Sequence, residues 1–259
     1  MQGMLDPAHL LMALLIGASL GFVGGVFGIG GGIVAVPLLV LGFGLDQPIA
    51  QGTALVLMAP NLLVGWWRYH QRHPMGWRAI AAIALSAALT TWLIAHMATR
   101  MDPQVLRAIF SVFMVLLALR LLRTAQQPQT PQAERRLDLR VLPLVGLVGG
   151  CSMGPLGIGG GLMAGPLLSG WLGQRQTTAQ GLSLALVAPS SVVALATYAS
   201  AHQVDWAWGV PLALGGVLTV SAGVALAHRL PEKPMRWSFA VILMATALWL
   251  AVGPQAAAR

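Results

Sequence analysis

Apolar residues fill ten long segments of this 259-residue chain, five in each half. Those of the first half are Ala8–Val26, Ile33–Leu45, Ala50–Trp67, Trp77–Met97 and Val105–Leu122. Those of the second half are Val141–Met153, Leu162–Leu172, Thr178–Ser200, Trp206–Ala227 and Trp237–Val252. Several approach the roughly 20 residues that a membrane-spanning helix needs, and none alternates apolar and polar positions as barrel strands do. The pattern predicts an all-α polytopic membrane protein.

One segment plan occurs twice along the chain. Gly28-Ile29-Gly30-Gly31-Gly32 returns 129 positions later as Gly157-Ile158-Gly159-Gly160-Gly161, and Gln51-Gly52 returns as Gln180-Gly181. We therefore expect a first membrane repeat at 1–123, a polar cytoplasmic linker at 124–140 and a second membrane repeat at 141–259. In both halves the first two segments are short, broken by Gly and Pro, and flank the glycine run.

Equivalent loops of the two halves carry opposite charge bias. Basic residues gather in the loop after the third segment, in the linker and in the loop before the last segment: Arg68, Arg72, Arg78, Arg123, Arg135, Arg136, Arg140, Arg229, Lys233 and Arg236. The N-terminal flank and residues 201–205 contain no Lys or Arg. Because basic loops stay in the cytoplasm, the repeats are predicted to be inverted, with both termini outside. Arg100 and Arg107 do not fit this assignment.

Two geometries give each half an odd number of crossings. Either all five segments cross, or the first two form a re-entrant hairpin and three cross. The hairpin is favoured, because short Gly-broken segments at matching places in two halves are typical of a transporter's binding site.

Composition agrees with a membrane protein and narrows its partners. Hydrophobic residues make up 57% of the chain and charged residues 8%, against about 25% charge in soluble domains. The net charge of +8 lies in loops between apolar segments, where membrane topology accounts for it. The partner is thus the lipid bilayer, and nucleic acid is excluded. The single cysteine, Cys151, cannot form an internal disulfide.

The two glycine runs are candidate anion-binding segments. Each opens an apolar segment, so its free N–H groups would lie at a helix N-terminus, where negative charge is stabilised. The glycines concerned are Gly28, Gly30, Gly31, Gly32, Gly157, Gly159, Gly160 and Gly161. Close helix packing is the alternative, and it is the favoured interpretation for Gly17-x-x-x-Gly21-x-x-x-Gly25 and Gly161-x-x-x-Gly165.

Polar side chains follow both glycine runs. Amide and hydroxyl groups lie early in the third and eighth segments and after their prolines: Gln51, Thr53, Asn61, Gln180, Ser183 and Ser190, with Gly52 and Gly181 beside the glutamines. Such groups can donate hydrogen bonds to an oxyanion. They can equally bond neighbouring helices to one another, and the sequence leaves both interpretations open.

Several classes of site are disfavoured. All seven carboxylates lie in loops or at segment edges, which weakens proton or cation transport through a buried carboxylate. The histidines form no spaced ligand set with Cys151, so neither a metal nor a cofactor is expected. No catalytic set lies within the apolar segments, so no enzymatic activity is expected.

Taken together, these segments resemble the TauE/SafE sulfite exporter family. The resemblance rests on Gly24-Gly25-x-x-Gly28-Ile29-Gly30-Gly31-Gly32 with Pro37, on Gln51-Gly52-Thr53, on Gly76-Trp77-Arg78 and on Val204-Asp205-Trp206, and it covers nearly the whole chain. Two departures stand out. Leu182 stands opposite Thr53, and the second copy has four extra residues before its glycine run, since Gly25 precedes Gly28 by three positions and Gly150 precedes Gly157 by seven.

The resemblance implies a bacterial inner-membrane protein that transports a small sulfur oxyanion or organosulfonate, such as sulfite or sulfoacetate. We expect a secondary transporter that exports this anion. Uptake of the same anion and a non-transporting assembly or anchor subunit are the alternatives. The sequence does not fix the oligomeric state, and a homo-oligomer is compatible with it.

Overall fold

The computed structural model describes residues 7–27, 31–124, 139–157, 160–174, 176–227 and 232–252, and all the regular elements among them are helices. The helices are α1 (Pro7–Phe27), α2 (Gly32–Phe43), α3 (Gln47–Arg72), α4 (Trp77–Ala98), α5 (Pro103–Thr124), α6 (Leu142–Leu156), α7 (Gly160–Pro166) with the π-helical turn η1 (Leu167–Trp171), α8 (Gln176–Ser200), α9 (Trp206–Ala227) and α10 (Glu232–Val252). Each predicted segment corresponds to one helical element, and the all-α polytopic fold is confirmed.

Six of the described helices are long and apolar enough to cross a membrane, namely α1, α3, α4, α5, α8 and α9. The segments after the glycine runs are short: α2 has 12 residues and α7 has seven. At the helical rise α2 is about 18 Å long, well below the thickness of a bilayer core. The first segment of each half is predicted to be short. This is confirmed for α6, which has 15 residues, and is wrong for α1, which has 21.

Helices α3 and α8 form the centre of the molecule. About two thirds of the most apolar stretch of each is buried (67% and 61%), against 33% for α1, α4 and α5. Gln51, near the start of α3, contacts Tyr198, near the end of α8, and Tyr69, near the end of α3, lies against Gly181, near the start of α8. The two central helices therefore run antiparallel.

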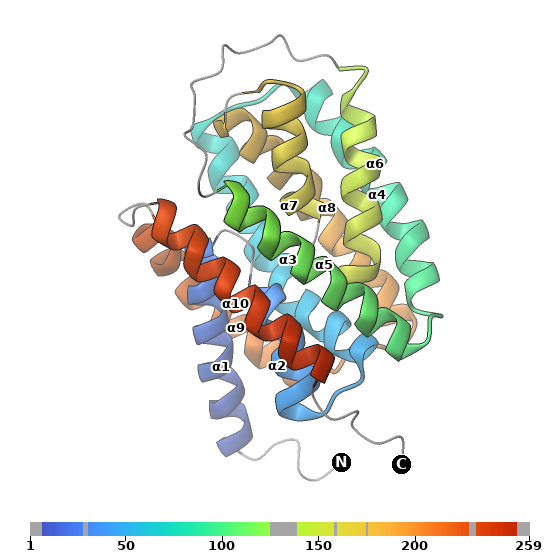
Figure 1. Cartoon of the computed structure of the whole chain (residues 1–259), viewed down its shortest axis with the longest axis vertical. Helices are drawn as coiled ribbons and strands as arrows, with labels where there is room; N and C mark the ends of the chain where they lie inside the picture. The colour runs from blue at the N-terminus through green and yellow to red at the C-terminus, as the bar shows by residue number, and fades with distance from the viewer. Residues whose placement is uncertain are drawn as a thin grey trace.

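The outer helices pack reciprocally across the two halves of the chain. Helix α1 packs on α9, and α6 packs on α4, as Figure 1 shows on opposite sides of the molecule. A methyl group added at Gly21 would overlap the backbone of Gly216 in α9, and one added at Gly17 would overlap Leu212. The expected packing role of Gly17, Gly21 and Gly25 is confirmed by these contacts.

Glycines of α6 pack on α4 in the second half as glycines of α1 pack on α9, and the corresponding positions are 129 residues apart. Gly146, Gly150 and Gly154 of α6 lie against the backbone and side chains of α4, where added methyl groups would overlap Ala87 and Ile94. These glycines are the counterparts of Gly17, Gly21 and Gly25. The predicted four-residue insertion is therefore wrong, since Gly154 rather than Gly150 matches Gly25 and the offset continues unbroken.

Figure 1 shows how the ends of the helices are arranged. The beginning of α1 and the end of α2 lie toward the lower end of the view, and residues 73–76 and the beginning of α6 lie at the upper end. Residues 73–76 belong to the basic loop predicted to be cytoplasmic. The inverted relation of the two repeats to a membrane, and the boundaries of the linker, remain predictions, and most of the linker lies outside the described residues.

Helices α5 and α10 form a further pair that closes one face of the molecule (Figure 1). Arg107 of α5 donates from Nε to the backbone oxygen of Leu250, 2.8 Å away in the last turn of α10. A cation is stabilised at a helix C-terminus by the free carbonyl groups and the helix dipole. This bond gives a structural reason for Arg107, which the distribution of loop charges did not explain.

Candidate functional site

Gln51 is a fully buried polar side chain on the central helix α3. Its Oε1 accepts a hydrogen bond of 2.9 Å from the hydroxyl of Tyr198, which also lies 3.2 Å from the backbone oxygen of Gly154. Its Nε2 has no hydrogen-bond partner among the described residues. A buried amide without a partner costs about 1–3 kcal/mol, so this N–H₂ group is available to a ligand.

The second glycine run begins beside Gln51. Gly157 ends α6 in a left-handed conformation with φ of 68°, and an added methyl group there would lie 3.8 Å from the backbone oxygen of Gln51. Left-handed backbone disfavours every residue with a side chain and is readily adopted by glycine. Gln51 of the first half and Gly157, the first residue of the second glycine run, therefore lie side by side.

The two glutamine–glycine pairs are not brought together. Gln180 and Tyr198 stand eighteen residues apart on α8, about 27 Å at the helical rise. Because Gln51 is bonded to Tyr198, the amide groups of Gln51 and Gln180 cannot contact the same small anion. Gln180 is also exposed, whereas Gln51 is buried.

Gly31 and Gly32 lie beside the middle of α3. An added methyl group at Gly31 would lie 3.6 Å from Leu57, and one at Gly32 would overlap Met58. Gly31 precedes α2 with a φ of 87°, and its backbone oxygen accepts a hydrogen bond of 3.1 Å from the N–H of Ala35. Gly31 and Gly32 thus stand at mid-height of the central helix.

Gly160 and Gly161 occupy the corresponding place beside α8. Added methyl groups there would lie 3.1 Å from Leu186 and 3.0 Å from Val187 respectively. Gly31 and Gly32 of the first run and Gly160 and Gly161 of the second therefore lie beside the middle of the central pair, and the re-entrant hairpin remains a prediction. Gly28, Gly30 and Gly159 lie outside the described residues.

The candidate hydroxyl groups already have backbone partners. Ser183 and Ser190 donate to Ala179 and Leu186, one turn earlier in α8. Thr53 accepts a hydrogen bond of 2.9 Å from the N–H of Asp205. A hydroxyl oxygen keeps further acceptor capacity, but its single proton is used when it donates to its own helix. Ser183 and Ser190 would have to rotate before donating to an anion.

Asn61 is another buried amide without a partner among the described residues. It is 5% exposed, and neither its Nδ2 nor its Oδ1 has a hydrogen-bond partner among the described residues. Its Nδ2 would lie 3.3 Å from a methyl group added at Gly216, where α1 crosses α9. Asn61 is about 15 Å along α3 from Gln51, so the two amides do not form one cluster.

Comparison with known proteins decides the family of this chain. The model of the family described as Sulfite exporter TauE/SafE matches residues 13–250. The chain belongs to the TauE/SafE family. Its relatives include a probable membrane transporter protein of Xylella fastidiosa (strain 9a5c), 29% identical over 251 residues that cover 93% of this chain and 94% of the relative.

More distant relatives carry the same description. A probable membrane transporter protein of Methanocaldococcus jannaschii is 22% identical over 92% of this chain and 94% of its own length. One of Haemophilus influenzae is 26% identical over 92% of this chain and 97% of its own length. This TauE/SafE protein is therefore a multi-pass membrane transporter.

Gly52 and Gly181 have packing roles in this TauE/SafE protein. An added methyl group at Gly52 would overlap the backbone oxygen of Gln203 and lie 3.0 Å from Val204. One added at Gly181 would lie 2.8 Å from both Tyr69 and Met75. Gly52 thus allows the loop after α8 to pack against α3, and Gly181 allows the loop after α3 to pack against α8. Contact of either glycine with substrate remains a prediction.

Tyr198 and Gln47 are polar residues of the centre that the sequence analysis passed over. Tyr198 is fully buried, and Gln47 is 2% exposed with neither amide atom bonded to a described residue. A signal for Tyr198 was present, since the chain has only two tyrosines and these, Tyr69 and Tyr198, are 129 positions apart.

Asp102 and Asp205 serve as helix caps. Asp102 accepts a hydrogen bond of 2.7 Å from the N–H of Gln104, and Asp205 accepts bonds of 3.0 and 3.2 Å from Ala207 and Trp208 at the start of α9. Such bonds satisfy the free N–H groups of a first helical turn. Within the described residues no group of three His, Cys, Asp or Glu side chains could hold a metal ion.

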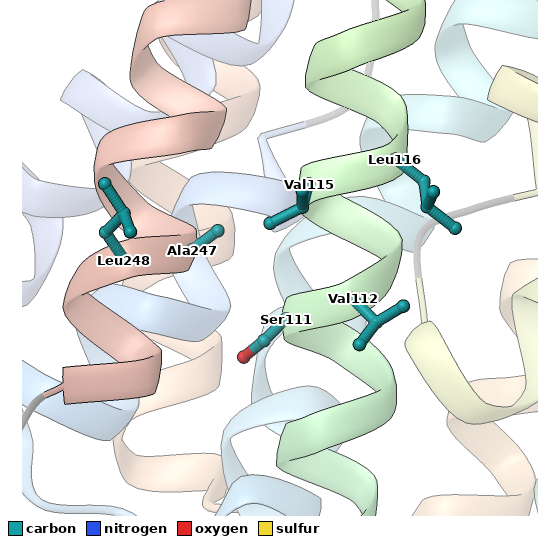
Figure 2. Close-up of a pocket in the computed structure, with 6 residues that line it drawn as sticks. All are labelled: Ser111, Val112, Val115, Leu116, Ala247 and Leu248. Atoms are coloured by element: carbon teal, nitrogen blue, oxygen red, sulfur yellow. The ribbon is translucent and has the colours of Figure 1, made fainter.

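A groove of about 270 Å³ lies between α5 and α10 (Figure 2). It is lined by Ser111, Val112, Val115, Leu116, Ala247 and Leu248. The hydroxyl of Ser111 donates to the backbone oxygen of Arg107 in its own helix. With no free donor, this apolar groove cannot bind an anion, and its exposed leucine and valine side chains suit contact with lipid chains.

Proposed function

We propose that this TauE/SafE transporter exports sulfite or a small organosulfonate from the bacterial cytoplasm. Gln51 and the glycine run 157–161 form the central part of its anion site, because Gly157 lies beside Gln51 and the Nε2 of Gln51 has no described partner. Gly31 and Gly32 contribute at mid-height, and Thr53, Asn61, Gly52 and Gln180 with Gly181, Ser183 and Ser190 line the route on either side.

The observation that carries the proposal is the unpaired Nε2 of Gln51. A fully buried N–H₂ group beside a glycine-lined turn offers donors without formal charge. An oxyanion accepts hydrogen bonds strongly, and bonds to charged groups are worth about 1.5–3 kcal/mol. A neutral site also releases its anion more readily than a cationic one, since no buried ion pair has to be broken.

The proposed export needs no coupling ion. A monoanion that leaves a negative cytoplasm gains about 2.3 kcal/mol per 100 mV of membrane potential. The described carboxylates Asp102 and Asp205 are engaged at helix starts, which fits transport without a buried proton-carrying carboxylate. We place the protein in the inner membrane with both termini periplasmic, because its basic loops then lie in the cytoplasm.

The test is anion binding to the purified transporter, measured as thermal stabilisation with sulfite, sulfate, thiosulfate, sulfoacetate and taurine. A ligand at 100 times its Kd adds about 2.7 kcal/mol of stability. We expect stabilisation by one sulfur oxyanion or organosulfonate, and efflux of the same anion from proteoliposomes.

Other outcomes would replace the proposal. Stabilisation by a cation or a neutral solute alone would overturn the substrate class. Binding with accumulation rather than efflux in energised vesicles would establish uptake, and binding of none of these with no flux would favour an anchor subunit.

A further inference from the structure

The two ends of the central helix pair are built from corresponding residues. At one end the start of α3 meets the end of α8 and residues 201–205. At the other end the start of α8 meets the end of α3 and residues 73–76. Val204 at the first end corresponds to Met75 at the second, and both lie against the glycine that follows a glutamine. The ends are two copies of one arrangement.

Hydrogen bonds close the first end. The Tyr198 hydroxyl bonds to Gln51, and the N–H of Asp205 bonds to Thr53. Gln203 donates from Nε2 to the backbone oxygen of Thr99, 2.8 Å away. These bonds tie the loop 201–205 to α3 and α4.

The second end lacks the side chains that form two of these bonds, namely the bond of Thr53 with the N–H of Asp205 and the bond of Gln203 with Thr99. Leu182 stands where the first end has Thr53, and Pro74 stands where it has Gln203. Leucine has no acceptor for a backbone N–H, and proline has no side-chain amide. The chemistry of the chain itself therefore favours closure of the first end over closure of the second.

Burial differs between the two ends in the same sense. Gln51 and Leu55 are 0% exposed, whereas their counterparts Gln180 and Leu184 are exposed and partly exposed respectively. Tyr198 is buried and Tyr69 is partly exposed. In a duplicated chain, one end closed and the other open is the arrangement that alternating access requires.

We propose that Gln51, Tyr198 and Thr53 form the gate at one end of the transport path, and that Gln180 and Tyr69 form the corresponding gate, which is open in this structure. Transport exchanges the two arrangements. The bonds of Thr53 and Gln203, which Leu182 and Pro74 cannot form at the other end, favour the state open at Gln180 as the resting state. This inference rests on the proposed transport function.

The resting state sets which side of the membrane the empty transporter faces. Residues 73–76 adjoin the open gate and belong to the loop with Arg68, Arg72 and Arg78, which is cytoplasmic by the distribution of basic residues. A transporter that rests open to the cytoplasm binds its anion there, and the membrane potential then drives the anion outward. The gate asymmetry thus fits the proposed export.

The test measures thiol accessibility in a Cys151→Ala background, in membranes and without sulfite. Leu55→Cys and Leu184→Cys place reporters at corresponding positions, one turn inward from the two glutamines. With a membrane-impermeant maleimide, we expect Leu184→Cys to react from the cytoplasmic side and Leu55→Cys to react at least tenfold more slowly from either side. Adding Tyr198→Phe should accelerate labelling of Leu55→Cys several-fold, because one gate bond is lost.

Tyr69→Phe is the matched control and should not accelerate that reaction. Thr53→Val removes a different bond of the same gate and serves if Tyr198→Phe does not fold. Equal labelling of the two reporters, or equal effects of the two tyrosine substitutions, would overturn the gate. Stabilisation of the wild-type protein by sulfite tests the substrate separately, so either proposal can fail alone.

Discussion

The Tyr198 hydroxyl and the Gln51 side chain are hydrogen-bonded across 147 residues of sequence, in a fully buried position. Tyr198 belongs to the second half of the chain and Gln51 to the first. The bond therefore joins the two central helices directly, at the point where the second glycine run begins. A change at either residue is expected to act on transport more than on folding.

Replacing Gln51 by leucine should weaken anion binding and leave the fold intact. The variant loses the free Nε2 donor, so we expect the Kd for the transported anion to rise about tenfold or more. Tyr198 can still donate to the backbone oxygen of Gly154, so the melting temperature should change little. Titration of the purified protein measures the Kd, with Gln71→Leu, an exposed position of the same helix, as control. Unchanged affinity would remove Gln51 from the site.

Alanine substitutions at Gly31 and at Gly44 introduce similar backbone strain, and only Gly31 belongs to the proposed anion site. Comparing the two variants therefore separates the effect of strain from the effect of damage to the site. Both glycines have positive φ, 87° and 68°, so either substitution costs about 1–2 kcal/mol. Gly44 has open space around it, whereas a methyl group at Gly31 approaches the backbone oxygen of Leu20 to 2.7 Å. We expect Gly31→Ala to abolish efflux from proteoliposomes and Gly44→Ala to retain it. Equal activity in both variants would contradict a role for the first glycine run.

Leucine at Gly21 should separate α1 from α9. The added side chain would enter the backbone of Gly216, and overpacking of this kind costs about 1–3 kcal/mol. We expect a clear loss of thermal stability in detergent. Gly65→Ala is the contrasting variant, since nothing lies within 4 Å of that position and alanine favours a helix by about 1 kcal/mol. A stable Gly21→Leu protein would show that α1 is not held by this contact.

Methionine at Arg107 should weaken the pairing of α5 and α10. The substitution removes the hydrogen bond to Leu250, and a bond from a charged donor contributes about 1.5–3 kcal/mol. We expect a lower melting temperature, with anion affinity unchanged because the bond joins α5 to α10 and does not involve Gln51 or its partners. Arg123→Met, at an exposed position of the same helix, should change stability by less than about 0.5 kcal/mol. Similar effects of the two substitutions would contradict the specific bond.

Much of the fold was predictable because the bilayer imposes it. A helix must satisfy its own backbone hydrogen bonds in lipid, so apolar length alone located elements such as Trp206–Ala227, whose bounds agree in sequence and structure. The candidate site was less predictable. Gln51 and Gln180 look equivalent in sequence, yet one is buried and bonded and the other is exposed.

The sequence by itself determined the membrane class, the helices, the duplication at an offset of 129 and the positions of the glycine runs, because each depends on residues that are close together in the chain. Only the tertiary structure decided that Tyr198 reaches Gln51, and that the two glutamines lie at opposite ends of the pair formed by α3 and α8. These relationships depend on how distant helices cross. Crossings are set by the shapes of facing side chains, and hydropathy does not record those shapes.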